Sequence, residues 1–307
     1  MQPPQFKDKL STALLKILPQ HLLAAGMYRL TRSTWKPLKN MLIREAVSRY
    51  AVDMFDAENP RPTSYPSFNA FFTRALKADA RRIAHEPDAV ASPCDGKVSQ
   101  AGYIRQGRLI QAKGHDFDLL ALLGGDKDLA ETFEDGAYST IYLSPRDYHR
   151  VHMPLSGKLK GMIFVPGELF SVSDATAQLI PGLYARNERL ICGFDTIAGP
   201  MLVILVGAIF VGSMETVWAG EVRAPGKDPS TWLYDSRQQI TLKKGEEMGR
   251  FNMGSTVITL FGKDAVEWDS AFVPGVRVRM GQRIGKVRRF SGKSSRRRPD
   301  RKHSASA

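Results

Sequence analysis

The sequence TIAGPMLVILVGAIFVGSM spans Thr196–Met214 and contains no charged residue. A segment of this length and polarity suits either a membrane-spanning helix or a pair of buried strands. Its glycines, Pro200 and β-branched residues favour strands, because all three disfavour a continuous helix. We therefore predict two buried strands, Met201–Val206 and Ala208–Ser213, joined by a turn at Gly207.

Several other short runs from about residue 88 onward share this β-branched and aromatic character and are separated by Gly and Pro turns. They predict further strands of a compact domain. The runs are Tyr138–Tyr142, Gly161–Val165, Thr256–Phe261 and Arg277–Met280. With the helices predicted below, the fold class is α+β, with N-terminal helices followed by a mostly β domain.

The N-terminal region is predicted to be helical, in three segments of which the first ends at Pro19 and the third spans about residues 38–55. Their apolar residues at helical spacing are Phe6, Leu10, Leu14, Ile17 and Leu18; Leu22, Leu23, Met27 and Leu30; and Leu42, Ala46 and Tyr50. No run approaches the ~20 apolar residues of a membrane span. No secretory signal is expected, because no small-residue cleavage site follows an apolar core.

Positive charge is concentrated at the two ends of the 307-residue chain, whose formal net charge is +13. Residues 1–50 contain nine Lys or Arg and two Asp or Glu, and residues 283–307 contain ten and one. Basic ends of this kind bind anionic lipid headgroups or nucleic acid. Basic helices with Tyr28 and Trp35 are typical of a membrane interface, although they could also pack on the body. Residues 288–307 are expected to be a disordered basic tail.

The two cysteines, Cys94 and Cys192, predict no disulfide framework. We interpret both as small buried apolar residues in a protein that functions in a reducing compartment.

The sequence GEEMGRFNMGST, residues 245–256, contains a serine directly after a glycine, at Gly254-Ser255. A hydroxyl in that place can attack the preceding carbonyl, because glycine leaves it open and tolerates the strained backbone. Elimination of the resulting ester would break the chain and leave a ketone in place of the serine. A Gly-Ser pair alone is more often an ordinary turn, so other segments have to support this reading.

Several segments, taken together, resemble the phosphatidylserine decarboxylases, a family of self-processing pyruvoyl enzymes. The resemblance runs in the family's order from about residue 5 to about residue 287, with one departure, Met253 in place of the usual Leu. The segments are Phe68–Arg74, Ser92–Val98, Lys113–His115, Tyr142–Pro154, Val165–Val172, Ala185–Arg189, Gly212–Val217 and Met253–Thr256.

The resemblance implies that Ser255 becomes a pyruvoyl group, so that the chain needs no pyridoxal phosphate and no metal. Cleavage between Gly254 and Ser255 would give a β chain of residues 1–254 and an α chain of residues 255–307. His152 would be the base that activates Ser255, oriented by Asp95 in an Asp-His-Ser arrangement. Asp95-Gly96 is also a common hairpin turn.

The resemblance makes His149 a substrate-site group and the proton donor after decarboxylation, with Asp147, His115 and Lys113 as further substrate-site candidates. Asp147 could instead cap a turn after Pro145. On a helix, His149 and His152 would share a face and could bind a metal, but no third ligand is apparent.

Side chains for the rest of a lipid substrate are less specified by the sequence. Candidates for the headgroup phosphate are Arg146, Arg150 and Lys113, among which the sequence does not choose. Phe71, Phe72 and Phe170 could border an acyl-chain entrance, although core positions are commoner for phenylalanine.

The expected function is therefore decarboxylation of phosphatidylserine to phosphatidylethanolamine, through a Schiff base to the pyruvoyl group, in phospholipid biosynthesis. The expected organisation is a membrane-associating region at 1–60, a catalytic domain at 61–287 and the tail. The expected location is peripheral, on the cytoplasmic face of the cell membrane, with a homodimer possible by resemblance. Alternatives are another substrate, such as a soluble amino acid or a different serine-headed lipid, and nucleic-acid binding by the tail. No nucleic acid is expected as a partner, because the tail alone supports that alternative.

Overall fold

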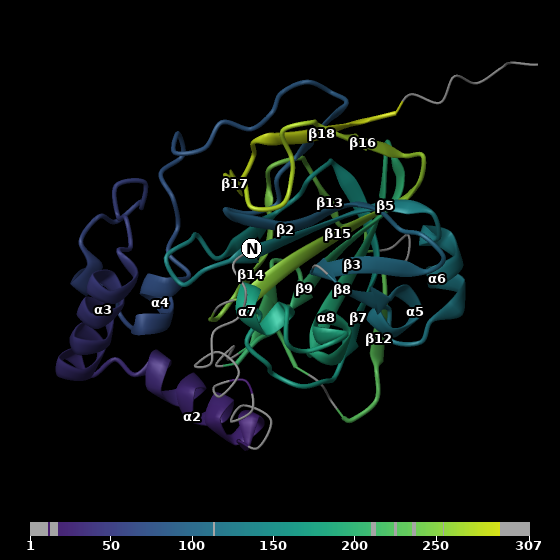
Figure 1. The fold of residues 1–307 in the computed structure, drawn as a ribbon. Helices are drawn as coiled ribbons and strands as arrows, with labels where there is room; N and C mark the ends of the chain where they lie inside the picture. The colour runs from purple at the N-terminus through teal and green to yellow at the C-terminus, as the bar shows by residue number, and fades with distance from the viewer. Residues whose placement is uncertain are drawn as a thin grey trace, which may run out of the picture.

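The structure, a computed structural model, describes residues 12, 18–112, 114–209, 213–223, 226–234, 238–253 and 255–288. Three helices lie beside a large β body in Figure 1: α2 (Gln20–Arg32), α3 (Lys36–Tyr50) and α4 (Phe68–Phe72). This arrangement confirms the α+β class. Apart from Thr12 and Leu18, the first predicted helix lies outside the described residues, as does the basic tail from residue 289.

The helices α3 and α4 bury a small core of their own, in which Ile43, Phe68 and Phe71 are buried. The helix α3 ends at Tyr50 because Ala51 adopts a left-handed conformation with φ 50°. The predicted extension to residue 55 is therefore wrong. Within the described residues, no helix combines the length and the hydropathy that crossing a membrane requires.

The largest sheet is antiparallel, and the uncharged segment supplies one of its central strands. That strand is β9 (Gly199–Val206), paired with β8 (Arg189–Thr196) on one side and β15 (Ser255–Lys263) on the other. The strand order is β12-β7-β8-β9-β15-β5-β2-β17, with β13 also paired to β7. The other strands are β12 (Ser230–Leu233), β7 (Gly157–Val165), β5 (Gly136–Leu143), β2 (Gly96–Tyr103), β17 (Arg277–Val278) and β13 (Thr241–Leu242).

The predicted second strand at 208–213 is wrong where the structure describes it. Ala208 and Ile209 are not in a strand, residues 210–212 lie outside the described residues, and the next strand begins at Met214. The strand predicted at Arg277–Met280 is shorter than expected and ends at Val278. The strands predicted around Tyr138, Gly161 and Thr256 are confirmed.

Each face of the central sheet has its own cover. A four-stranded sheet packs on the first face: β11 (Gly220–Val222), β10 (Met214–Thr216), β14 (Glu247–Phe251) and β6 (Arg150–His152). A third sheet, β1 (Ala89–Ala91), β18 (Arg283–Val287) and β16 (Val266–Trp268), joins the same core.

Short elements cover the second face: the β3–β4 hairpin (Arg108–Ala112, His115–Asp118) and the helices α5 (Leu119–Leu122), α6 (Lys127–Phe133), α7 (Asp174–Ala177) and α8 (Leu183–Arg186). A 3-10 helix, η1 (Pro62–Ser64), lies beside α3. Cys94 and Cys192 are fully buried and free in the first core, which confirms the expected burial of both residues.

Candidate active site

Ser255 is the first residue of β15, where its backbone pairs with Leu143 of β5. On the other side of β15, Thr256 pairs with Val206 at the end of β9. Gly254, the other half of the predicted cleavage site, lies outside the described residues, as does the Ser255 side chain. The predicted cleavage site therefore falls at one end of the central strands.

The backbone is strained directly before this site. Met253 has φ 154°, a region that residues with a side chain rarely adopt. Such outliers cost about 1–3 kcal/mol and cluster at functional sites. Asn252 holds the chain just upstream, because its amide donates to Ser213 Oγ at 2.7 Å and to Glu215 Oε1 at 2.9 Å.

An apolar cavity of about 290 Å³ is lined in part by Leu143, which pairs with the Ser255 backbone, and by Met253, two residues before Ser255. Phe71 and Phe72 line it and are also core residues, at 1% and 3% exposure, while Phe170 belongs to the core on the second face. The core interpretation of all three phenylalanines is confirmed. An apolar cavity beside the site can hold part of a lipid and exclude water.

His149 is buried just before β6, with its ring 4.0 Å from that of Phe72. Its Nδ1 lies 2.8 Å from the backbone oxygen of Asp147, which can only accept, so Nδ1 carries the proton. Its Nε2 is buried and has no hydrogen-bond partner among the described residues. Burial, reinforced by the charge of Arg74, lowers the pKa of His149 to about 3. The ring is therefore neutral at pH 7 and keeps a free lone pair on Nε2.

His152 lies on β6 with both ring nitrogens engaged. Its Nδ1 donates to the Gly245 carbonyl at 2.8 Å, and its Nε2 accepts from the Tyr148 hydroxyl at 3.0 Å. Burial lowers its pKa, while the Gly245 carbonyl and the charges of Glu247 and Asp95 oppose that shift. Neither His149 nor His152 lies on a helix. They therefore do not share a helical face, which the metal alternative required. Among the described residues, no group of three or more His, Cys, Asp or Glu is placed to hold a metal ion.

Asp95 lies in a bend between β1 and β2, which belong to different sheets, so the hairpin alternative is wrong. Its carboxylate accepts from Arg81 Nε at 3.1 Å and from the Met280 backbone N–H at 2.7 Å. Arg81 also forms an ion pair with Asp56 at 2.6 Å. Within the described part of the chain, Asp95 makes no hydrogen bond to His152. The Arg81 pairing had no signal in the sequence, because it joins segments that are distant along the chain.

The Asp147 carboxylate caps a turn, as the alternative interpretation expected, by accepting from the Ser144 N–H at 2.8 Å and its hydroxyl at 2.6 Å. It also forms an ion pair with Arg277. Because the Asp147 backbone oxygen anchors Nδ1 of His149, this turn holds the histidine in place.

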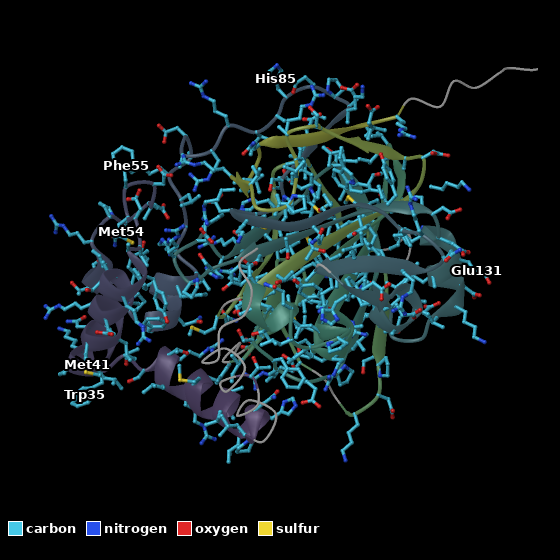
Figure 2. The ribbon with its side chains drawn as sticks, viewed as in Figure 1. Trp35, Met41, Met54, Phe55, His85 and Glu131 are labelled. Atoms are coloured by element: carbon cyan, nitrogen blue, oxygen red, sulfur yellow. The ribbon has the colours of Figure 1, made fainter. Side chains whose placement is uncertain are left out.

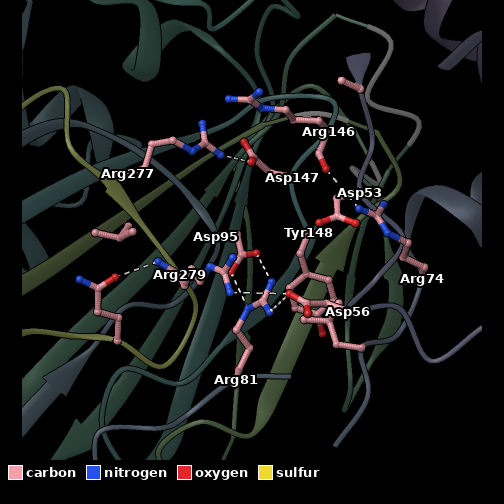
Figure 3. A pocket seen from close by; sticks show the side chains of 14 residues that line it. Asp53, Asp56, Arg74, Arg81, Asp95, Arg146, Asp147, Tyr148, Arg277 and Arg279 are labelled. Carbon is pink, nitrogen blue, oxygen red and sulfur yellow. Dashed lines mark hydrogen bonds and ion pairs between the residues drawn. The ribbon is translucent and has the colours of Figure 1, made fainter. Parts of the chain in front are cut away.

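Asp95 and Asp147 share a polar cleft of about 610 Å³. Figure 3 shows its charged lining, in which arginines and aspartates alternate: Asp53, Asp56, Arg74, Arg81, Asp95, Arg146, Asp147, Arg277 and Arg279. Arg74 is 4% exposed, and within the described part of the chain its Nε and Nη1 have no hydrogen-bond partner. Burial lowers the pKa of Arg74. Unpaired donors on a buried guanidinium are suited to an anion.

The three phosphate candidates that the sequence left open, Arg146, Arg150 and Lys113, differ in their surroundings in the structure. Arg150 is engaged by the Thr73 carbonyl at 2.9 Å and by Glu247 at 2.7 Å. Arg146 is exposed and borders both the polar cleft and a groove beside Tyr142. Lys113 lies outside the described residues.

The structure brings Asp95, Asp147, His149 and His152 to the same end of the β body. His115 is placed elsewhere, in the β3–β4 hairpin opposite Ala112, and lines neither the polar cleft nor the apolar cavity.

Comparison with known proteins assigns this chain to a family. The sequence profile described as phosphatidylserine decarboxylase matches residues 68–286, and a second profile, described as PSD, matches residues 10–51. A protein of Azotobacter vinelandii named phosphatidylserine decarboxylase proenzyme is 52% identical over 283 residues, 92% of this chain and 99% of its own length. Proteins of the same name from Bordetella avium and Methylococcus capsulatus are 51% and 52% identical, over 91% of this chain and 95% and 97% of their own lengths.

The fold and these matches define a decarboxylase, an enzyme of the lyase class. The chain belongs to the phosphatidylserine decarboxylase family.

Proposed function

We propose that this chain decarboxylates phosphatidylserine to phosphatidylethanolamine with a pyruvoyl group formed from Ser255. The observation that carries the proposal is the strained Met253 backbone immediately before Gly254-Ser255, next to an apolar cavity. The relatives' name, proenzyme, supports a chain that is cut to become active. Cleavage would yield a β chain of residues 1–254 and an α chain of residues 255–307.

In the proposed maturation, the Ser255 hydroxyl attacks the Gly254 carbonyl and strain at Met253 favours the reaction. His152 is the proposed base, because its neutral ring carries a lone pair on Nε2 and the Tyr148 hydroxyl extends from that nitrogen. Asp95 supports the protonated ring through its negative charge, while Arg81 fixes the carboxylate.

The residues around Ser255 fit a pyruvoyl group, since a buried unpartnered nitrogen, His149 Nε2, accompanies an apolar cavity at this end of the sheet. Such a group supplies a ketone that holds the substrate amine and accepts the electron pair left by carbon dioxide. His149 Nε2 would take a proton from the substrate and return it later. Phe71 and Phe72 would exclude water from the reacting carboxylate.

The headgroup phosphate is proposed to bind the unpaired donors of Arg74 together with Arg146, at the mouth of the site. His115 and Lys113 remain sequence predictions with no contact that supports them.

A peripheral position on the cytoplasmic face of the cell membrane is proposed from the helical side of the molecule. Trp35, Met41 and Phe55 point outward there in Figure 2, at 65%, 59% and 75% exposure. Exposed Lys36 and Arg44 accompany them, a combination that suits an anionic lipid surface.

Intact-mass spectrometry of the purified protein and of Ser255→Ala tests the proposal. We expect two wild-type chains divided at 254–255, the smaller with a pyruvoyl N-terminus, and one whole chain for Ser255→Ala. Carbon dioxide release from phosphatidylserine vesicles, but not from free serine, would distinguish the lipid from a soluble amino acid. Vesicles of another serine-headed lipid would identify the remaining alternative. A folded wild-type chain that stays whole would refute the proposal.

A further inference from the structure

Glu188, Gly207 and Ser255 lie in a row across three neighbouring chain segments at one end of the central sheet. The last paired residues at this end are Arg189 with Val206 and Val206 with Thr256. One residue further, the Gly207 N–H donates to the Glu188 carbonyl at 2.9 Å. Ser255, which precedes Thr256 in β15, is the next residue in line with Glu188 and Gly207.

Glu188 and Gly207 belong to one face of the sheet. Leu190 and Leu205 lie across from one another and share the first core. Because side chains alternate along a strand, the positions two residues further toward this end, 188 and 207, face the same way.

Gly207 leaves the space between the other two positions open to the Glu188 side chain. A β-carbon placed on Gly207 would lie 3.0 Å from Glu188 Cγ and 3.3 Å from its Oε1, so the carboxyl extends over the glycine. The Glu188 carboxyl therefore lies over Gly207, the position between Glu188 and the Ser255 backbone in this row.

The Glu188 carboxyl has no hydrogen bond or ion pair with any residue that the structure describes. The neighbouring charges are directed elsewhere: Arg186 lies over the Phe170 ring, Arg189 donates to the Leu122 carbonyl at 2.6 Å, and Glu168 is exposed. Burial alone raises the pKa of Glu188 to about 7. Glu188 is half-buried, and no partner among the described residues explains a carboxyl in this place.

We infer that Glu188 is the base that removes the α-proton of Ser255 during self-cleavage, an inference that rests on the proposed function. The Cα–H electron pair forms the Cα=Cβ bond of residue 255, and the Cβ–O bond of the ester breaks. Gly254 leaves as a carboxylate, and the proton ends on Glu188. No other reactant is required.

The step has a chemical reason to use this carboxylate. A base whose pKa lies near the working pH is ionised in a useful fraction and is stronger than an ordinary glutamate. His152 remains the proposed base for the Ser255 hydroxyl. Two successive proton transfers would thus use two different groups.

The test compares self-cleavage of freshly made Glu188→Gln with wild type and with Glu168→Gln, a matched control on the adjacent exposed glutamate. Glutamine keeps the shape and loses the base, so we expect cleavage slowed about 100-fold or more. The ester should then persist. Neutral hydroxylamine should split it into residues 1–254 and a chain that begins with an unmodified Ser255, measured by mass.

Glu188→Asp, which keeps the carboxyl on a shorter arm, should cleave more slowly than wild type but faster than Glu188→Gln. Glu168→Gln should match wild type. The inference is overturned if Glu188→Gln cleaves at the wild-type rate, or if it stays whole and resists hydroxylamine while folded. Failure of wild type itself to divide at 254–255 would instead refute the proposed function.

Discussion

Acidification should destabilise the folded chain through His149, and the structure sets the size of the effect. The folded ring has a pKa of about 3, against an ordinary value of 6.5. A histidine with a lowered folded pKa gives stability that is complete above 6.5 and is lost as the pH falls toward 3, because the unfolded chain binds the proton first. Between pH 7 and pH 4.5 this linkage amounts to about 2.5 kcal/mol.

The measurement is urea unfolding at both pH values in a Ser255→Ala background, which keeps the chain whole. His149→Asn retains a donor near the position of Nδ1 and cannot titrate, so its stability should fall about 2.5 kcal/mol less than that of the parent. His85→Asn is the matched control for the exchange of histidine for asparagine, because His85 is at the surface in Figure 2. Equal pH dependence for His149→Asn and the parent would refute a buried neutral imidazole.

Two further changes probe the surroundings of the site by urea unfolding in the same background. Gly207→Ala should cost about 1–3 kcal/mol, because its β-carbon would lie 3.0 Å from Glu188 Cγ. Gly262→Ala, whose nearest contact is 3.9 Å, should be nearly neutral, and equal losses would contradict the steric reading. Arg189→Met should cost at least about 3 kcal/mol, because it removes the donors to the carbonyls that end α5. A loss under about 1 kcal/mol would mean that water replaces this guanidinium.

The central strand β9 was predictable, because a strand buried on both faces needs a continuous uncharged apolar segment such as Met201–Val206. The same reasoning failed at 208–213, since Ala208 and Ile209 are apolar for another reason: they line the cavity beside the predicted cleavage site. Hydrophobicity alone does not separate a buried strand from the wall of a cavity. The end of α3 was missed because Ala51 adopts a left-handed conformation without the usual glycine.

The candidate site was predictable as a set of residues but not as a network. Asp95, His149 and His152 were named as site residues from the segments that carry the family resemblance. The roles of Arg81, Arg74 and Glu188 depend instead on contacts between distant parts of the chain. The hairpin reading of Asp95-Gly96 followed local turn preferences and failed because β1 and β2 pair with other strands. Local propensity cannot report which sheet a strand will join.

The connection between two sheets explains why the strain is at Met253. The chain leaves the covering sheet at Phe251, the end of β14, and enters the central sheet at Ser255, with three residues between. Asn252 is fixed upstream by Ser213 and Glu215, and Ser255 is fixed downstream by pairing with Leu143. A crossing this short, held at both ends, concentrates distortion in the few residues between its anchors.

Cutting the chain at 254–255 would release that distortion without releasing either piece. β14 stays paired with β6 and β10 in the covering sheet, and β15 stays between β5 and β9 in the central one. The interior side chains Phe251 and Val257 belong to one shared core, so the cut ends remain in place. The same architecture that strains the connection would therefore keep the new N-terminus of the smaller chain next to the apolar cavity.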